Sequence, residues 1–373
     1  MSDLVVSADT PALTGGHELR TYAIVRALCA LGPVDLLYAQ FGASEPSPEF
    51  RSTPGLTLHR ARPTRGARRL ASYARARLGG VPDGFARGVS PELVDRAHEL
   101  AGDPGRGRVI ADGPVVAGAL RALARRRPVI YNAHNLEAPF AVDSDGGDTR
   151  NARRMERFER GLIENAAESW MVGPTDVDAA RALVPGARVR YVPNVVDVAS
   201  IRPVTYPAGE RRVLFVANFT YAPNLEGLRF LIDEVLPHVW QEIPDARLAV
   251  VGRGLEGPPS GDPRVESLGF VADLPPVYAT ADCVTVPMLR SSRSPLKFVE
   301  ALAYRVPVVA TPTAASGLEV TAGEDYLEGD CARAFAAAIA VALRGEAAGI
   351  AARGRALAER AYSIESLVDR LAA

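Results

Sequence analysis

The segment Arg211–Gly254 decides the fold class, and it reads RRVLFVANFTYAPNLEGLRFLIDEVLPHVWQEIPDARLAVVGRG. Near its two ends lie the short apolar runs VLFV and LAVV, which are typical of strands buried on both faces of a sheet. Between them, residues 224–240 have the length and apolar spacing of a helix. Two strands joined by a helix predict parallel pairing, which is the repeating unit of a doubly wound α/β sheet.

The same alternation of strands and helices extends over the whole chain. In the carboxyl half, further strands are predicted to start at Cys283 and Val306, next to helices over 274–281 and 295–304. In the amino half, helices are predicted over 19–31 and 91–100, and the strands start at Leu4, Val34, Leu56, Arg108, Pro128 and Ser169. Because 373 residues exceed one ordinary domain, two Rossmann-like domains are expected.

A polar passage over 189–210, punctuated by prolines, looks like an inter-domain linker. We therefore expect a first domain over 1–200 and a second domain over 201–355. Parallel α/β sheets bind ligands at the carboxyl ends of their strands, so the active site is expected in the crevice between the two sheets. The arginine-rich stretch 64–86 is predicted to contain a helix and loops.

Composition excludes several classes of function. Acids and bases are interspersed and sum to a net charge of −1, which leaves no electrostatic footprint for nucleic acid. No apolar run approaches the roughly 20 residues of a membrane span. The first residues lack a secretory signal, so a cytoplasmic protein without integral membrane association is expected. Cys29, Cys283 and Cys331 lack the spacing of a disulfide framework or a zinc site. No oligomeric state is predicted.

Lys297 is the only lysine among 43 basic residues, and it falls at a predicted helix start in SPLKFVEALA. Ser294 is predicted to cap this helix, with Pro295 at its first position. A cation in the first turn opposes the helix macrodipole, and a bound diphosphate would remove that misfit. Glu300 lies on the same side of the helix and could accept hydrogen bonds from a ribose. The alternative interpretation is a solvated Lys–Glu pair.

Three glycine-containing turns follow predicted strands. Gly15 and Gly16 precede a helix, where backbone N–H groups attract a phosphate or a carboxylate. Arg253 lies in the turn VVGRGLEG, while Gly269 and Phe270 lie in LGFVAD. Either of the last two turns could present its backbone to a flat base. The alternative for all three is an ordinary packing turn.

His134, Asn135 and Glu137 follow the strand that starts at Pro128. A histidine beside an asparagine at a strand exit can hydrogen-bond a sugar or support developing positive charge. The alternative is a histidine with a structural role. No second His or Cys has ligand spacing with His134, so no metal is expected.

Together these motifs resemble the retaining glycosyltransferases of family 4, within the GT-B superfamily, over nearly the whole chain. In the carboxyl half the resemblance is carried by residues 215–254, 268–288 and 294–319. In the amino half it is carried by TGGHELRTYAIVRAL from Thr14, HNLE from His134 and PNVVD from Pro193. The resemblance implies the GT-B fold, with a last helix over 356–373 that packs back on the first domain.

The resemblance also implies an activity. It is the metal-independent transfer of a sugar, with retention of anomeric configuration, from a UDP- or GDP-linked sugar to a hydroxyl acceptor such as a specialised metabolite or a glycan. The nucleotide sugar is a co-substrate, and no cofactor is expected. Two alternatives stay open: a nucleotide-sugar epimerase or hydrolase on the same scaffold, and an inactive nucleotide-sugar-binding homologue.

The resemblance assigns roles to individual residues. Lys297 and His134 are the implied catalytic residues. The implied donor-binding residues are Gly15, Gly16, Arg253, Gly269, Phe270, Arg293, Lys297, Glu300, Gly317 and Leu318. The implied acceptor-binding residues are His17, Asn135 and Glu137.

The sequence departs from the family pattern at two places that bear on the site. Ser292 stands where many members carry the first of two glutamates, the second being Glu300, and this leaves the sugar undefined. Asn218 and Phe219 stand where the family often has Arg and Lys. Neutralisation of the phosphates is therefore expected to depend more heavily on Lys297, with Arg293 or Arg253 as further candidates.

Overall fold

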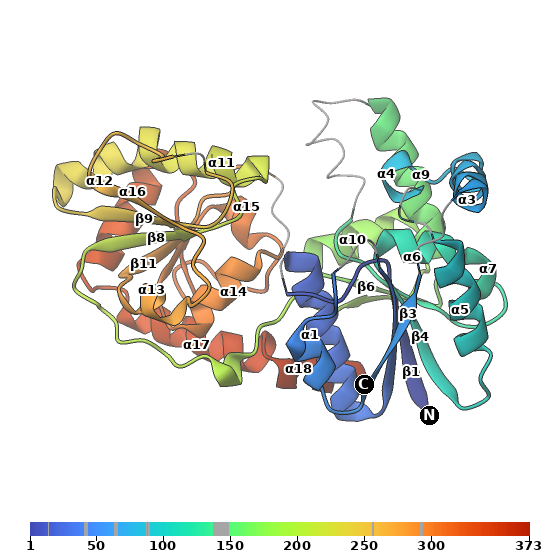
Figure 1. The fold of residues 1–373 in the computed structure, drawn as a ribbon. Helices are drawn as coiled ribbons and strands as arrows, with labels where there is room; N and C mark the ends of the chain where they lie inside the picture. The colour runs from blue at the N-terminus through green and yellow to red at the C-terminus, as the bar shows by residue number, and fades with distance from the viewer. Residues whose placement is uncertain are drawn as a thin grey trace. The chain divides into compact units, whose positions relative to one another are not determined.

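The computed structural model describes residues 1–13, 15–40, 44–62, 66–86, 88, 90–136, 149–255, 257–290 and 294–373. The chain divides into two compact units. Unit 1 comprises Met1–Pro193 and Leu367–Ala373, and unit 2 comprises Asn194–Ser366. Each unit is built around one parallel sheet with helices on both faces (Figure 1). The expected α/β class with two doubly wound sheets is confirmed.

Unit 1 has a seven-stranded sheet in the order β3-β2-β1-β4-β5-β6-β7. All neighbouring strands are parallel, and Val5 of β1 lies opposite Leu36 of β2 and Ile110 of β4. β1 and β4 read as apolar runs because helices cover both faces of the sheet. The strands are β1 (Ser2–Ser7), β2 (Val34–Ala39), β3 (Leu56–Ala61), β4 (Arg106–Asp112), β5 (Ile130–Asn132), β6 (Glu168–Met171) and β7 (Val189–Tyr191).

The helices of unit 1 fill the crossovers between its strands, as parallel pairing requires. They are α1 (Gly16–Leu31), α2 (Pro48–Ser52), α3 (Ala67–Leu78), α4 (Asp83–Ala86), α5 (Pro91–Ala101), α6 (Gly113–Ala119), α7 (Arg121–Ala124), α9 (Thr149–Asn165) and α10 (Pro174–Leu183). The last helix, α18 (Ile364–Ala372), enters unit 1 from Leu367 onward, where Nη1 of Arg108 donates to the carbonyl of Leu371 at 2.8 Å.

Unit 2 has a six-stranded parallel sheet in the order β10-β9-β8-β11-β12-β13. Its strands are β8 (Arg212–Val216), β9 (Arg247–Val251), β10 (Val265–Gly269), β11 (Cys283–Val286), β12 (Val308–Ala310) and β13 (Leu327–Glu328). Its helices are η1 (Val198–Ser200), α11 (Ala222–Arg229), η2 (Phe230–Val235), α12 (Leu236–Glu242), α13 (Pro275–Ala279), α14 (Leu296–Ala303), α15 (Pro312–Ala315), α16 (Ala332–Leu343) and α17 (Ala348–Ala361).

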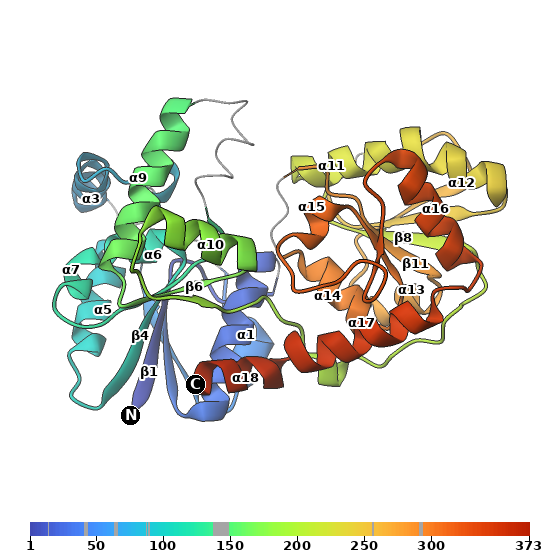
Figure 2. The ribbon, with the colours of Figure 1, turned by 180° about the vertical axis from the view of Figure 1, so that it is seen from behind.

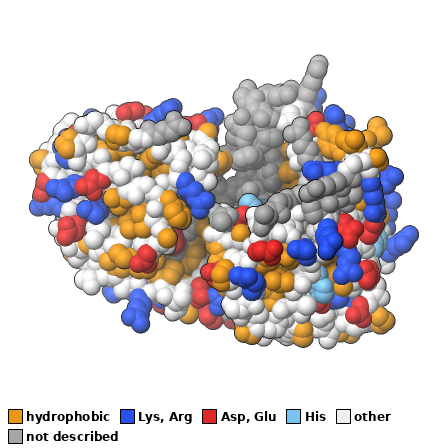
Figure 3. Space-filling view, viewed as in Figure 1, with side chains coloured by type: hydrophobic (Ala, Val, Ile, Leu, Met, Phe, Trp, Pro, Cys, Tyr) orange, Lys and Arg blue, Asp and Glu red, His pale blue; other side chains and the backbone are white. Residues whose placement is uncertain are grey.

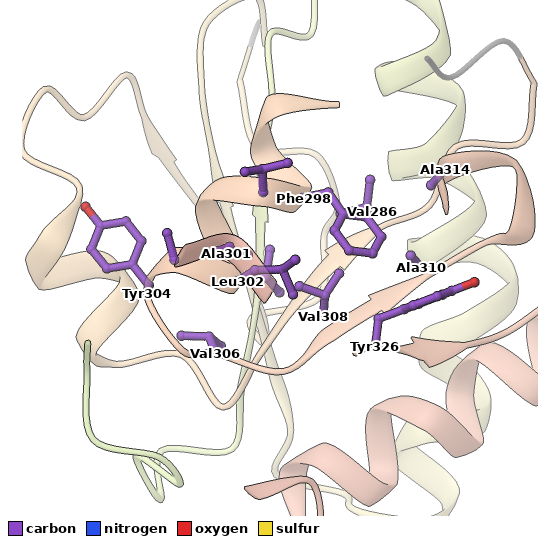
Figure 4. Packing of buried hydrophobic residues seen from close by; sticks show 14 of the residues in the cluster. Val286, Phe298, Ala301, Leu302, Tyr304, Val306, Val308, Ala310, Ala314 and Tyr326 are labelled. Carbon is purple, nitrogen blue, oxygen red and sulfur yellow. The ribbon is translucent and has the colours of Figure 1, made fainter. Parts of the chain in front are cut away.

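Two apolar cores lie on the two faces of the second sheet. One forms under α11, α12 and α16, and the other under α13, α14 and α17 (Figure 2). Figure 4 shows the second core, where Phe298 and Leu302 of α14 pack with Val308 of β12 and Tyr326. The rings of Phe298 and Tyr326 meet edge to face, with centroids 5.4 Å apart. This packing fixes α14, the helix that carries Lys297.

Three sequence expectations differ in detail from the structure. The passage predicted as a linker begins with a strand, β7, so the chain passes to unit 2 at Pro193 rather than at residue 200. Helix α14 begins at Leu296 with Pro295, not Ser294, as its N-cap, because Ser294 adopts a left-handed φ of 52°. The helix predicted over 224–240 contains a π-helical stretch, η2, just before Pro237, which has no N–H for an α-helical bond.

Within the described part of the chain, no single helix is long and apolar enough to cross a bilayer. The pair α16 and α17 meets the length and composition criteria only when taken together, and it is bent by 95°.

Candidate functional site

Each sheet has a topological switch point, where the order of its strands changes direction. In unit 1 this point lies between β1 and β4, and in unit 2 it lies between β8 and β11. Open α/β sheets bind ligands beside such points, at the carboxyl ends of the strands. The chain segments that follow these four strands carry most of the polar groups described below.

Lys297 lies in the first turn of α14, and its ammonium reaches the region after β8. Nζ donates a hydrogen bond of 2.6 Å to Oδ1 of Asn224 and lies 5.0 Å from the centroid of the Phe215 ring. Burial lowers the pKa of Lys297 to about 7, and no described carboxylate counteracts this shift. A partly buried cation with an amide rather than an acid as its partner suits an anionic ligand.

Asn224 is held in place by the loop that follows β8. Its Nδ2 donates to the carbonyl of Asn218 at 2.7 Å, and Oδ1 of Asn218 accepts from the amide and the hydroxyl of Thr220 at 3.1 and 2.8 Å. Sequence reasoning did not assign a role to Asn224. The available signal was the pair Pro223–Asn224 in the segment that follows a strand at the switch point.

Glu300 lies one turn further along α14 and has a different partner from Lys297. Its Oε2 accepts a hydrogen bond of 3.1 Å from Oη of Tyr278, and the Tyr278 ring stacks on Tyr304 with centroids 3.9 Å apart. Burial raises the pKa of Glu300, although the tyrosine bond opposes the shift. Lys297 and Glu300 therefore do not form the solvated ion pair of the alternative interpretation.

The two glycine turns of unit 2 lie side by side at the carboxyl ends of β9 and β10. The amide of Gly252 donates to the carbonyl of Gly269 at 2.8 Å, and Gly269 has a φ of 63°. The guanidinium of Arg253 lies 4.7 Å from the centroid of the Phe270 ring, and 62% of Phe270 is exposed. Arg253, Gly269 and Phe270, predicted separately, form one exposed aromatic and cationic surface.

The turn after α15 is already well bonded within the chain. The amide of Leu318 donates to the carbonyl of Ala315 at 2.9 Å, and the amide of Glu319 donates to Oη of Tyr362 at 2.6 Å. The backbone N–H groups of Leu318 and Glu319 therefore already donate within the chain and would not be available to a ligand that approached Gly317 and Leu318.

In unit 1, His134 is bonded to a buried aspartate at the end of β4. His134 Nε2 lies 3.0 Å from Oδ1 of Asp112, which also accepts a hydrogen bond of 2.8 Å from Asn132. Oδ2 of Asp112 accepts from the hydroxyl of Thr21 at 2.6 Å. Burial acts to raise the pKa of Asp112, but His134 and the hydrogen bonds lower it below its usual value. Asp112 is therefore an anion that orients the imidazole.

A buried arginine extends this network. Arg20 of α1 donates to Oδ1 of Asn132 at 2.7 Å and to the carbonyl of Val192 at 2.8 Å, and burial lowers its pKa to about 10. Gly113, with a φ of 80°, leaves space for the imidazole, since a Cβ there would lie 2.8 Å from Cε1 of His134. Sequence reasoning missed Arg20 and Asp112; for Asp112 the available signal was a polar residue at the end of a buried strand.

The glycine turn after β1 carries acids rather than cations. The ring of His17 lies 5.8 Å from that of His134, and its Nε2 is 3.9 Å from Asp9 and 3.7 Å from Glu18. A Cβ on Gly15 would lie 2.7 Å from Oε2 of Glu18. Carboxylates and an imidazole at this turn are better partners for hydroxyl groups than for a phosphate.

Glu137, Ser292 and Arg293 lie outside the described residues, and Asn135 makes no side-chain hydrogen bond to the residues that the structure describes. Within the described ranges, no three His, Cys, Asp or Glu side chains are grouped so that they could hold a metal ion.

Comparison with known proteins relates unit 2 to a glycosyltransferase family and the fold of the whole chain to that of GT-B glycosyltransferases. Residues 210–344 match the family model described as Glycosyl transferases group 1, and they contain Lys297, Glu300 and both glycine turns of unit 2. The match lies within unit 2, and it supports the predicted glycosyltransferase class. No curated protein sequence matches the chain significantly.

Solved structures share the fold over the whole chain. Sucrose-phosphate synthase from Thermosynechococcus elongatus aligns with a TM-score of 0.74 at 19% identity, covering 100% of this chain and 98% of that one. Anabaena HepE in complex with UDP-glucose gives 0.67 at 17% identity, covering 99% and 98%. Trehalose 6-phosphate synthase from Burkholderia multivorans gives 0.66 at 16% identity, covering 100% and 98%.

Proposed function

We propose that this protein is a retaining, metal-independent glycosyltransferase that moves a sugar from a nucleotide-diphosphate sugar to a hydroxyl acceptor. The observation that carries the proposal is Lys297, a partly buried ammonium at a switch-point helix start whose side-chain partner is the amide of Asn224. A diphosphate would supply the negative charge that this ammonium lacks. Glu300 would accept hydrogen bonds from the ribose, and the Arg253–Phe270 surface would meet the base.

The reaction breaks the bond between the anomeric carbon and the diphosphate oxygen and forms a bond to the acceptor oxygen on the same face of the sugar. Negative charge grows on the departing diphosphate, and Lys297 stabilises it as a fixed cation. The acceptor proton passes to the departing phosphate, so no protein base is required for this step. His134, oriented by Asp112, would contact the transferred sugar, while His17 would contact the acceptor.

The sugar donor is a uridine or guanosine diphosphate sugar, and the acceptor is a specialised metabolite or a glycan. Uridine donors are the first to test, because HepE, which shares the fold, has been solved with UDP-glucose. We place the activity in the cytoplasm as part of this proposal.

The test follows release of free nucleotide from a panel of UDP- and GDP-sugars, with and without a panel of hydroxyl acceptors. We expect acceptor-dependent release that persists in EDTA, and NMR of the product should show the anomeric configuration of the donor. Release of free sugar without an acceptor would indicate a hydrolase, and interconversion of donors an epimerase. Binding without turnover would indicate an inactive homologue. Inverted product or strict dependence on a divalent ion would refute the corresponding part of the proposal.

A further inference from the structure

Helix α3 (Ala67–Leu78) presents an apolar face to solvent. No residue of α3 is buried, and the side chains that are partly covered, such as Tyr73 and Ala76, lie on its inner side. Leu70 is 69% exposed and Leu78 is 90% exposed. The exposed apolar residues recur at helical spacing and so share one face; they are Ala67, Leu70, Ala71, Ala74 and Leu78. A surface helix of a globular protein normally turns such a face inward.

Arginines border this outer face. At 100° per residue, Arg68 and Arg75 lie along one edge of the apolar face and Arg77 lies along the other. Figure 3 shows hydrophobic side chains gathered at the place of α3, with Lys and Arg side chains beside them. The arrangement is that of an apolar strip between two cationic borders.

The surrounding segment is strongly basic although the protein as a whole is nearly neutral. From Arg60 to Gly88 the sequence has eight arginines and a single acid, Asp83, whereas the whole chain has a net charge of −1. Arg68 pairs with Asp95 and Arg77 with Asp83, and all four side chains are well exposed. Among the described residues, no carboxylate pairs with Arg69 or Arg75. Exposed pairs of this kind exchange readily with other anions.

We propose that α3 binds an anionic lipid surface. The leucine side chains enter the boundary between headgroups and acyl chains, and the arginines that border them bind lipid phosphates while their stems lie along apolar surface. Charge complementarity favours this occupant over an apolar protein groove, because an anionic bilayer surface attracts basic residues that lie near it. Such binding is peripheral, and it is independent of the activity proposed above.

The test is sedimentation of the full chain with phosphatidylcholine vesicles that contain or lack phosphatidylglycerol. We expect binding only to the anionic vesicles, weakening as salt is added. The double variant Arg68→Glu/Arg75→Glu should lower the partition coefficient by about tenfold or more. Leu70→Ser/Leu78→Ser should also lower it by about tenfold, because apolar burial is lost.

Matched controls separate these effects from changes in total charge or folding. Arg333→Glu/Arg360→Glu makes the same charge change at exposed positions of unit 2, and Leu31→Ser changes a leucine that is 40% exposed. Both should bind vesicles within about twofold of the unmodified chain. Hydrogen exchange should show new protection of Ala67–Leu78 on anionic vesicles, with thermal melting reporting that every variant is folded.

Three outcomes would overturn the proposal. They are absence of binding to anionic vesicles at low salt, equal binding to neutral vesicles, and equal loss of binding in the α3 and control variants. Nucleotide release without vesicles should be unchanged in the α3 variants, so failure of the membrane proposal is distinguishable from failure of the proposed activity.

Discussion

Lys297 is the single residue on which the proposed chemistry depends most. Lys297→Ala should lower turnover by about 10²–10³-fold, because a charge that stabilises the departing diphosphate is removed. Lys297→Arg should also be impaired, since a planar fork replaces a point charge beside Asn224. Glu300→Gln should weaken donor binding more than turnover. Steady-state kinetics with saturating donor measures all three, and near-normal turnover in a folded Lys297→Ala protein would refute the role.

The pKa of Lys297 makes a second prediction, about stability. In the folded protein its pKa is about 7, below the ordinary value of 10.5. Below about pH 7 the lysine is charged in both states, and the cost of burying it is fully present. Between these pKa values the unfolded chain holds a proton that the folded chain has lost, so this cost shrinks as the pH rises. Lys297→Met should therefore stabilise the ligand-free protein most below about pH 7.

The measurement is urea denaturation of both proteins at about pH 6 and about pH 9, where contributions from other groups cancel in the difference. A stability difference that did not shrink with rising pH would show that the lysine is not buried as a cation. A saturating nucleotide sugar should reverse the order of stability, because the charged lysine would then have its anion.

Asp112 is expected to act through His134. Asp112→Asn keeps the size of the side chain but removes the anion that accepts from Thr21, Asn132 and the imidazole. Turnover should fall by about 10–100-fold, as for other partners that orient a functional histidine. NMR of ¹⁵N-histidine should show a changed tautomer balance of His134. Thr21→Ser, which keeps the hydroxyl, is the control, and an unaltered histidine spectrum in Asp112→Asn would contradict the orienting role.

At this scale the sequence indicated candidate site residues better than the partners that hold them. Lys297 and Glu300 were predicted because a charged pair at a helix start has a local signature. Asp112 and Asn224 were not predicted, because each bonds to a side chain that is distant in the sequence. Thr21 lies 91 residues from Asp112, and Lys297 lies 73 residues from Asn224. A contact between distant segments leaves no periodicity in the sequence.

At the scale of elements, Gly227 decides how closely α11 approaches the end of β11. A Cβ at this position would lie 2.5 Å from the carbonyl of Pro287, which is rigid backbone. Gly227→Ala should cost about 1–3 kcal/mol of stability through overpacking and should displace Asn224 from Lys297, which weakens donor binding. In α17, Gly349 meets only the end of the Arg353 side chain, at 3.3 Å.

The control, Gly349→Ala, should therefore be neutral or slightly stabilising, because alanine is the better helix former. Isothermal titration with a nucleoside diphosphate and thermal melting of both variants test the idea. Equal effects of the two substitutions would mean that the close approach at Gly227 does not position the site.

Long, periodic elements were predictable, and short ones at the edges were not. In both sheets, strands that contain an apolar run could be located in the sequence from that run alone. β7 was assigned to a linker, because its three residues, VRY, carry one arginine and precede a proline-punctuated passage. Its pairing with β6 over Val189–Tyr191 depends on the rest of the sheet being present.

At the scale of the molecule, the chain leaves unit 1 at Pro193, forms unit 2 and returns to unit 1 at Leu367. The returning segment is anchored inside unit 1. The carbonyl of Leu371 accepts from Arg108 of β4, the carbonyl of Arg370 accepts from Arg190 of β7, and Leu371 is 2% exposed. The stability of unit 1 should therefore depend on the last residues of the chain, although unit 2 lies between them in sequence.

Leu371→Ala should lower the free energy of unfolding of unit 1 by about 2–5 kcal/mol, since part of a buried leucine is replaced by a cavity. The control is Asp369→Ala, at an exposed position of the same helix, which should change this free energy by less than about 0.5 kcal/mol. Native-state hydrogen exchange under mild denaturant should show lost protection in β4 and β7 but not in β8 and β9. Nucleoside diphosphate binding should persist when turnover is lost, because Lys297 and Asn224 both belong to unit 2. Equal loss of protection in both sheets would show that the units do not open separately, and no loss in either would show that the terminal helix does not contribute to the core of unit 1.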